Sequence, residues 1–278
     1  MIGPRVTAPF GRRQLPVTGA RRHGPYTVLC CEDHRGPRPA AGQFYMLSAA
    51  ERWGGGDRER PFLPRAFSVM RAPATGNELQ FMLQDVGPGT ARLCELDEGD
   101  FLLALGPLGA GFRAPRDGRR ALLVGGGIGI APLAILHDRL TGSDPDEAAG
   151  GGLAGPPPAA LLGFRDADHA AGAELLAGAR VATDDGSAGH HGPVTELLVA
   201  ELHLDGHAEV YACGPPAMLE AVRILCAERE LPAQLALEAG MACGFGACFG
   251  CVVETVDGYE RVCLDGPVFD GSRLTVVT

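Results

Sequence analysis

Short apolar runs separated by Gly, Pro and charged residues fill the first half of the chain. They lie at residues 26–31, 43–47, 66–70, 79–83 and 101–105. Strands of this length with such punctuation are typical of a small antiparallel barrel. The pattern therefore predicts a β-barrel over residues 26–115. Before it, residues 1–25 form a polar, Arg-rich tail that we expect to be poorly ordered.

The pattern changes after residue 115. Apolar runs at 121–124, 159–164, 181–183 and 209–213 alternate with helical stretches at 132–140, 195–202 and 216–230. Strands that alternate with helices imply a parallel sheet. We expect an α/β domain over 116–236 and a small separate domain over 237–278. Residues 141–158 have no periodicity, which predicts a mobile surface insertion.

Composition narrows the class of protein. The chain has 278 residues, 46% of them apolar, with a net charge of −10, and all its strongly basic side chains are Arg. An acidic balance argues against nucleic acid or an anionic membrane as partner, because both are polyanions. The longest apolar stretch, 121–136, is interrupted by Gly and Pro, so it does not predict a membrane span. We expect a cytoplasmic protein, in which nine cysteines are not a disulfide framework.

Four cysteines near the C-terminus have the spacing C-x4-C-x2-C-x11-C. They are Cys243, Cys248, Cys251 and Cys263. This is the spacing of plant-type [2Fe–2S] ligation. Gly244, Gly246 and Gly250 permit a tight loop that approaches the inorganic sulfides closely. Zinc is the alternative metal, since four thiolates also suit it, although zinc ribbons have two CxxC pairs and this segment has one.

The other five cysteines have no ligand spacing. Cys30, Cys31, Cys94 and Cys226 fit ordinary apolar packing. Cys213 differs because it opens a Cys-Gly-Pro turn directly after a predicted strand. A role beside a nicotinamide and a packing role both remain open for it.

A Gly-rich turn joins the first strand and helix of the α/β domain. Residues 125–132 read GGGIGIAP, with Gly125, Gly127 and Gly129 at alternate positions. Such a turn lets a dinucleotide pyrophosphate approach the backbone and the positive end of the helix dipole. A purely structural turn is the alternative. After the third strand, Asp184 would repel a 2′-phosphate, which favours NAD over NADP, although Asp-Gly pairs also suit plain turns.

The barrel region carries two further motifs. Arg65 and Ser68 form R-x-x-S, in which the Arg would hold a flavin diphosphate and the Ser hydroxyl would meet the flavin near N5. On its own, this motif is weak and fits a solvated Arg better. Residues 87–90, Gly-Pro-Gly-Thr, offer backbone N–H groups and a hydroxyl to a phosphate.

The order of these motifs resembles the ferredoxin–NADP reductase superfamily. R-x-x-S is followed by G-x-G-T, then GPLGAGF, GGGIGIAP and CGP, and the ending MACGFGACFGC with RVCLDGPVF is similar to one branch of it. That branch is the electron-transfer subunit of NAD-linked dihydroorotate dehydrogenase, the PyrK family. The resemblance covers residues 26–278.

The resemblance implies a flavin-binding barrel, a NAD-binding α/β domain and a small [2Fe–2S] domain. It implies FAD contacts from Arg65, Ala66, Phe67, Ser68, Met82, Leu83, Gln84, Gly89 and Thr90, and cluster ligation by the four cysteines. Ser68 and Cys213 are the candidate catalytic residues, and Gly125, Gly127, Gly129 and Asp184 the candidates for NAD. The middle positions of RAFS depart from the usual family text.

The resemblance also implies a role as an electron relay in pyrimidine biosynthesis. A partner subunit with FMN would oxidise dihydroorotate, in an assembly of two copies of each subunit. Electrons would then pass through the [2Fe–2S] cluster and FAD to NAD+. Three alternatives stay open: a subunit of a NAD(P)-dependent ferredoxin or sulfide oxidoreductase, an oxygenase reductase, and a zinc-stabilised binding module without enzymatic activity.

Overall fold

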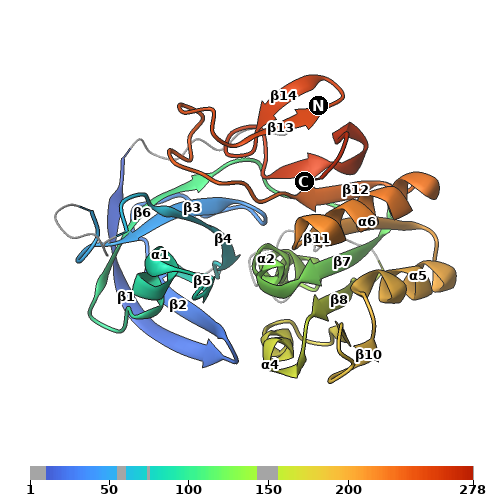
Figure 1. Cartoon of the computed structure of the whole chain (residues 1–278), viewed down its shortest axis with the longest axis horizontal. Coiled ribbons are helices and arrows are strands. Elements are labelled where there is room, and N and C mark those ends of the chain that lie inside the picture. The colour runs from blue at the N-terminus through green and yellow to red at the C-terminus, as the bar shows by residue number, and fades with distance from the viewer. Residues whose placement is uncertain (1–10, 55–60, 74–75, 143–155, 278) are drawn as a thin grey trace.

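The structure is a computed structural model that describes residues 11–54, 61–73, 76–142 and 156–277. Figure 1 shows the barrel at the left, the sheet with its helices at the right, and the C-terminal hairpin above them. Most of the expected insertion, residues 143–155, lies outside the described residues. No helix in the described ranges is long and apolar enough to cross a membrane.

Six antiparallel strands close the barrel in the order β1-β2-β5-β4-β3-β6. Their bounds are β1 Arg13–His23, β2 Tyr26–Glu32, β3 Phe44–Ala49, β4 Arg65–Arg71, β5 Glu78–Gln84 and β6 Phe101–Leu108. The short helix α1, Pro88–Cys94, follows β5. The five predicted strands are confirmed, because in each of them the apolar run supplies buried side chains.

Strand β1 corrects the expectation of a poorly ordered tail over 1–25. Residues 13–23 pair with both β2 and β6 and complete the barrel. Leu15 and Val17 place alternate side chains in the core, at 2% and 3% exposure. The outer positions, including Arg21 and Arg22, are polar, so the strand lacks the apolar run that marks its neighbours. The barrel therefore begins at Arg13, not at residue 26.

The second sheet has seven strands in the order β10-β9-β8-β7-β11-β12-β15. Its strands are β7 Arg120–Gly126, β8 Ala159–Phe164, β9 Arg180–Thr183, β10 His190–His191, β11 Ala208–Cys213, β12 Ala233–Ala236 and β15 Val268–Asp270. All pairs are parallel except β12 with β15. The predicted parallel sheet is thus confirmed, with one antiparallel strand added at its edge.

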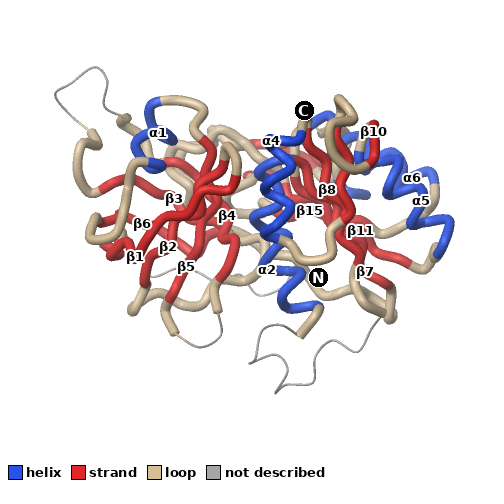
Figure 2. Tube along the Cα trace, turned by 90° about the horizontal axis from the view of Figure 1, so that it is seen from below, coloured by secondary structure: helices blue, strands red, loops and turns tan. Residues whose placement is uncertain are grey.

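Helices cover both faces of this sheet. They are α2 Ile130–Leu140, α4 Ala167–Ala170, α5 Val194–Leu204 and α6 Pro216–Glu228, with 3-10 turns η1 Gly127–Gly129, η2 Ala171–Leu175 and η3 Gly271–Arg273. Figure 2 shows α2 between the barrel and the sheet, and α5 and α6 on the side away from the barrel. Helix α2 contacts β4, so the barrel packs against the first helix of the α/β domain.

The expected small C-terminal domain is present, and it is joined to the edge of the parallel sheet. A hairpin, β13 Val252–Thr255 with β14 Gly258–Arg261, projects from it, but β15 pairs with β12. A single bridge, Ala110 to Pro267, also ties the segment to the end of the barrel. The segment therefore contacts both larger units.

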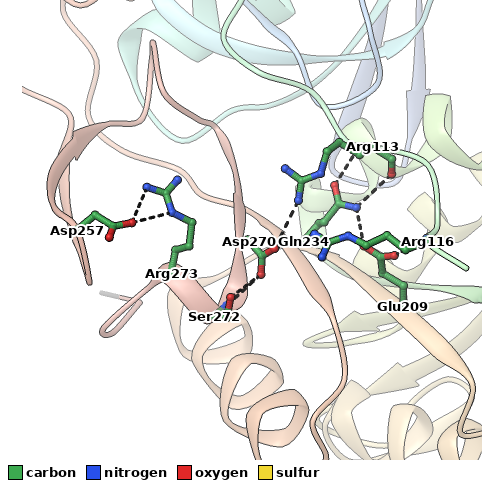
Figure 3. A network of polar contacts seen from close by, with 8 residues as sticks. All are labelled: Arg113, Arg116, Glu209, Gln234, Asp257, Asp270, Ser272 and Arg273. Carbon is green, nitrogen blue, oxygen red and sulfur yellow. Dashed lines mark hydrogen bonds and ion pairs between the residues drawn. The ribbon is translucent and has the colours of Figure 1, made fainter. Parts of the chain in front are cut away.

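Buried polar groups hold the connection after β6 to this edge of the sheet (Figure 3). The Gln234 amide accepts from the Arg113 N–H at 2.8 Å and donates to the Arg113 carbonyl at 3.1 Å. It also donates to the fully buried Glu209 carboxylate at 2.8 Å, which accepts a second bond from the Arg116 N–H at 2.9 Å. Arg116 reaches on to Asp270 of β15 at 2.8 Å. One network thus joins the connecting segment to β11, β12 and β15.

Candidate functional site

A cavity of about 720 Å³ lies where the barrel, the start of α2 and the C-terminal segment meet. Its lining includes Arg65, Ala66, Phe67, Ser68, Met82, Gln84, Thr90, Ile128, Ala131, Pro132, Leu237, Glu238, Ala239, Gly240 and Met241. Three motifs that are far apart in the sequence therefore border one cavity. They are R-x-x-S, the Gly-rich turn and the residues that precede the first clustered cysteine.

Leu83 is placed differently from the other expected flavin residues. It is fully buried in the barrel core and is absent from the cavity lining, whereas its neighbours Met82 and Gln84 line the cavity. Side chains alternate across a strand, so the Leu83 side chain points to the face of β5 opposite that of its two neighbours. The other barrel residues expected from R-x-x-S and β5 lie on the lining.

Gly89 lies against the side chain of Arg65, which lines the cavity. A Cβ on Gly89 would stand 2.6–2.7 Å from three atoms of the Arg65 side chain, so only glycine leaves room for the guanidinium there. The Arg65 guanidinium donates to the Leu63 carbonyl and lies 5.9 Å from the centre of the Trp53 ring. The Thr90 hydroxyl donates to the Gly87 carbonyl at 2.9 Å. A fixed cation beside a side-chain-free backbone fits a diphosphate.

The Gly-rich turn packs tightly against β8 and the turn after β11. A Cβ on Gly125 would stand 2.7 Å from Leu162, and one on Gly129 would collide with the Cys213 carbonyl. Packing alone therefore requires these two glycines. Gly127 is different, because it has a φ of 52° and a Cβ there would meet only the Tyr26 hydroxyl, at 3.7 Å. Among the three predicted positions, Gly127 is the one that leaves the backbone accessible.

The two other nucleotide candidates, Cys213 and Asp184, are absent from the cavity lining. Cys213 ends β11 beside Gly125 and is 2% exposed, and burial, with a smaller effect of Glu238, raises the pKa of its thiol well above the usual value. Asp184 is exposed after β9, at the carboxyl edge of the sheet. Dinucleotides bind at this edge in parallel sheets. The neighbouring Asp185 accepts bonds from the Ser187 N–H and hydroxyl, which is ordinary turn geometry.

Glu238 is a site residue that sequence reasoning missed. It is the sole carboxylate on the described lining of the cavity, where its side chain is exposed, and desolvation by the surrounding atoms raises its pKa. The signal in the sequence is a charged residue two positions after a fully buried strand, β12, and shortly before Cys243. A carboxylic acid with a raised pKa is suited to hold or move a proton beside a redox group.

The four clustered cysteines lie in one loop and on the short segment after β14. Cys251 and Cys263 are buried, and Cys248 is exposed. The Gly246 N–H donates to the Cys263 sulfur at 3.1 Å, and the Cys263 N–H donates to the Cys251 sulfur at 3.5 Å. Backbone donors aimed at cysteine sulfurs are what iron–sulfur clusters use to tune their potential.

The Cys243 thiol lies among backbone donors that favour its thiolate form. Burial raises the pKa of this thiol, but backbone N–H groups of Phe245, Cys248 and Ala247 outweigh it and bring the pKa to about 7. Gly244, with a φ of 79°, passes so close to Met46 of β3 that a Cβ would collide with that side chain. The loop is therefore seated on the barrel with its donors turned inward.

The chemistry of the donor set fits a [2Fe–2S] cluster. Four thiolates in the C-x4-C-x2-C-x11-C spacing would supply two ligands to each of two irons. Backbone N–H groups already point at two of the four sulfurs.

Comparison with known proteins agrees with this geometry. A profile of the iron–sulfur cluster binding domain of dihydroorotate dehydrogenase B matches residues 238–275. Among solved structures, an NADH-dependent reduced ferredoxin-NADP oxidoreductase is similar, with a TM-score of 0.76 at 23% identity, covering 96% of this chain and 92% of that one. A Neisseria gonorrhoeae ferredoxin NADP+ reductase with bound FAD and NADP has a TM-score of 0.60 at 18% identity, covering 78% and 91%.

Barrel and sheet together have the fold of ferredoxin–NADP reductase structures. The electron transfer subunit of dihydroorotate dehydrogenase B (NAD(+)) from Clostridium perfringens is 35% identical over 233 residues, which are 83% of this chain and 85% of that protein. The corresponding subunit from Bacillus caldolyticus is 40% identical over 231 residues, 78% and 81% of the two chains. This chain belongs to that family of electron transfer subunits.

Proposed function

We propose that this chain carries electrons from dihydroorotate oxidation, performed by a catalytic partner subunit, through a [2Fe–2S] cluster and FAD to NAD+. Its family places it as one subunit of a larger enzyme. The observation that carries the proposal is the continuity of the site. Residues 237–241 line the cavity and lead directly into Cys243, so a cluster in the cysteine loop and a flavin in the cavity would share one wall.

In this proposal the barrel residues hold the flavin. Arg65 and the bare backbone at Gly89 would bind its diphosphate, and Ser68 and Gln84 would face its ring. Bound FAD would convert single electrons from a cluster into the electron pair that NAD+ accepts. Ile128, Ala131 and Pro132, at the start of α2, would form a further part of the flavin-binding wall.

NAD+ would bind at the carboxyl edge of the parallel sheet. Its pyrophosphate would meet the backbone at Gly127, and Asp184 would favour a free 2′-hydroxyl over a 2′-phosphate. Cys213 remains buried behind this turn, so its thiol would act as a neutral packing surface beside the nicotinamide.

The finer parts of the proposal concern the assembly. The catalytic partner would carry FMN, and two copies of each subunit would form a cytoplasmic heterotetramer in pyrimidine biosynthesis. The partner would approach from the side of Cys248, which is the exposed cysteine of the four. An electron-transfer route needs such an exposed end.

The test is reconstitution with an FMN-type dihydroorotate dehydrogenase subunit. Dihydroorotate-dependent reduction of NAD+ should appear only when both chains are present. Cys248→Ser should abolish it while leaving NADH-dependent dye reduction through the flavin, and Cys94→Ser, at a half-buried cysteine outside the cluster, should leave both activities. Equal loss of both activities in Cys248→Ser would contradict the relay order.

A second candidate is a subunit of a ferredoxin or sulfide oxidoreductase. The coverage of 96% of this chain by the ferredoxin-NADP oxidoreductase fold favours it. Reduced ferredoxin or sulfide, offered in place of the dihydroorotate partner, would then support NAD(P)+ reduction. Iron, zinc and flavin analysis of the purified chain separates both candidates from a zinc-stabilised module.

A further inference from the structure

Arg261 reaches from the end of β14 across to the cysteine loop. Its Nη1 donates to the Gly246 carbonyl at 3.2 Å, and its guanidinium carbon lies 4.9 Å from the centre of the Phe249 ring. Its Nε is 3.6 Å from the Asp265 carboxylate. One side chain thus contacts the loop at two points, on either side of Cys248.

The backbone of Arg261 is fixed as well. Its N–H donates to the Asp265 carboxylate at 3.0 Å, and its carbonyl accepts from the N–H of Leu264 at 3.0 Å and of Asp265 at 2.8 Å. These bonds close the turn that contains Cys263. Arg261 therefore links the segment of the fourth cysteine to the loop of the other three.

Gly246 is the point where this link meets the sulfurs. Its N–H donates to the Cys263 sulfur. Its carbonyl and the Ala247 N–H are the two polar groups of the Gly246–Ala247 peptide. That peptide is trans, so its N–H points away from its carbonyl. Arg261 on the oxygen consequently turns the Ala247 N–H to the opposite side of this peptide. A peptide that accepts a bond at its oxygen also donates more strongly.

The backbone conformation of Phe249 costs free energy, which a contact with a neighbouring side chain can offset. It has a φ of 56°, the left-handed region that residues other than glycine rarely adopt, and it lies between Cys248 and Cys251. Its ring is 62% exposed, and the guanidinium of Arg261 lies over it. A cation over an aromatic face is attractive, so Arg261 stabilises the turn that sets the spacing of these two cysteines.

We propose that Arg261 is a positioning residue for the iron–sulfur cluster: it orients the Gly246–Ala247 peptide toward the sulfurs, holds Phe249 over the loop, and adds a fixed positive charge that raises the cluster's reduction potential. The alternative is an ordinary surface ion pair with Asp265, with no effect on the cluster. This proposal rests on the proposed function, because it requires that the chain binds an iron–sulfur cluster. Different experimental outcomes would refute the role of Arg261 and the proposed function.

The experiment compares Arg261→Met and Arg261→Lys with Arg273→Met in the full chain carrying its cofactors. Arg273 is a matched control because it lies in the same segment and pairs with Asp257 and Glu260, not with the cysteine loop. The measurements are the cluster's midpoint potential, the electron paramagnetic resonance spectrum of the reduced cluster, and the rate at which a chelator bleaches it.

Arg261→Met should lower the potential, change the spectrum and speed cluster loss about tenfold or more, the usual effect of losing an outer-shell partner. Arg261→Lys, which keeps the charge but not the planar stack, should restore most of the potential and less of the retention. If Arg261→Met assembles no cluster while Arg273→Met does, the proposal stands. It is overturned if Arg261→Met matches the wild type, or if Arg273→Met gives the same changes. A wild-type chain without any cluster would instead refute the proposed function.

Discussion

Gly89→Ala should weaken FAD binding without unfolding the barrel. The new Cβ would stand 2.6–2.7 Å from Nε, Cζ and Nη2 of Arg65, closer than atoms tolerate. These atoms are the far end of a flexible side chain, so the guanidinium moves and the backbone does not. The substitution should therefore displace the cation from the proposed diphosphate site and leave the core of the barrel intact.

The size of the effect follows from the bond that is lost. A hydrogen bond between a charged group and its partner contributes about 1.5–3 kcal/mol. Since 1.4 kcal/mol is a factor of ten, the dissociation constant of FAD should rise about 10- to 100-fold. The unfolding midpoint of the flavin-free protein should change little, because no buried apolar group is removed.

Gly87→Ala is the matched control in the same loop. Gly87 has a φ of 160°, which any residue adopts, and nothing lies within 4 Å of a Cβ built there. Flavin-free protein would be titrated with FAD, with binding followed by flavin fluorescence. In an Arg65→Gln background, Gly89→Ala should add almost nothing to the loss. Equal FAD affinity of Gly89→Ala and Gly87→Ala, or full additivity with Arg65→Gln, would refute the reasoning.

Three further predictions concern stability and reactivity. Gln234→Leu removes three hydrogen bonds, one of them to a buried carboxylate, and should cost about 3–5 kcal/mol of unfolding free energy in urea, whereas Gln80→Leu, which loses one bond, should cost about 1 kcal/mol. Burial raises the pKa of Cys213, so mass spectrometry after brief alkylation of cluster-free protein at pH 8 should find Cys248 modified and Cys213 intact; a modified Cys213 would show that the β11 turn opens. Burial acts to raise the pKa of Asp270, but hydrogen bonds from Arg116 and Ser272 outweigh it and lower this pKa from 3.8. The ionised carboxylate therefore stabilises the fold fully above about pH 4, and this contribution is lost as the pH falls further. Asp270→Asn should make the unfolding temperature fall less steeply as the pH is lowered below about 4.

Much of the fold could be predicted from local pattern, and the exceptions have a common cause. The strands with uninterrupted apolar runs, such as β2, β3 and β7, were predictable because both of their faces are buried. Strand β1 buries only alternate residues at its start and carries Arg on its outer face. Strand β15 has only three residues, and its pairing with β12 is what makes it part of the sheet. Both depend on partners that are distant in the sequence.

The candidate site divides in a similar way. Spacing alone predicts the cysteine set, because three of its members share one loop, and glycine motifs indicate the nucleotide-binding turns. Spacing does not decide which side of β5 faces the cavity, so Leu83 was expected there although it lies in the barrel core. It also does not indicate Glu238 or Arg261, whose positions depend on how the C-terminal segment packs on the rest of the chain.

That packing explains why the cysteine segment is unsuited to be an independent domain. It has few buried apolar residues of its own, and each of its ends is held by another unit: Gly244 lies on Met46 of the barrel, and Phe269 of β15 pairs with Leu235 of the sheet. Because the two larger units contact the same short segment, their relative position determines the geometry of the cavity wall at 237–241. A change that loosens β15 from β12 should therefore alter both the cysteine loop and the flavin cavity, even though neither contains the altered residue.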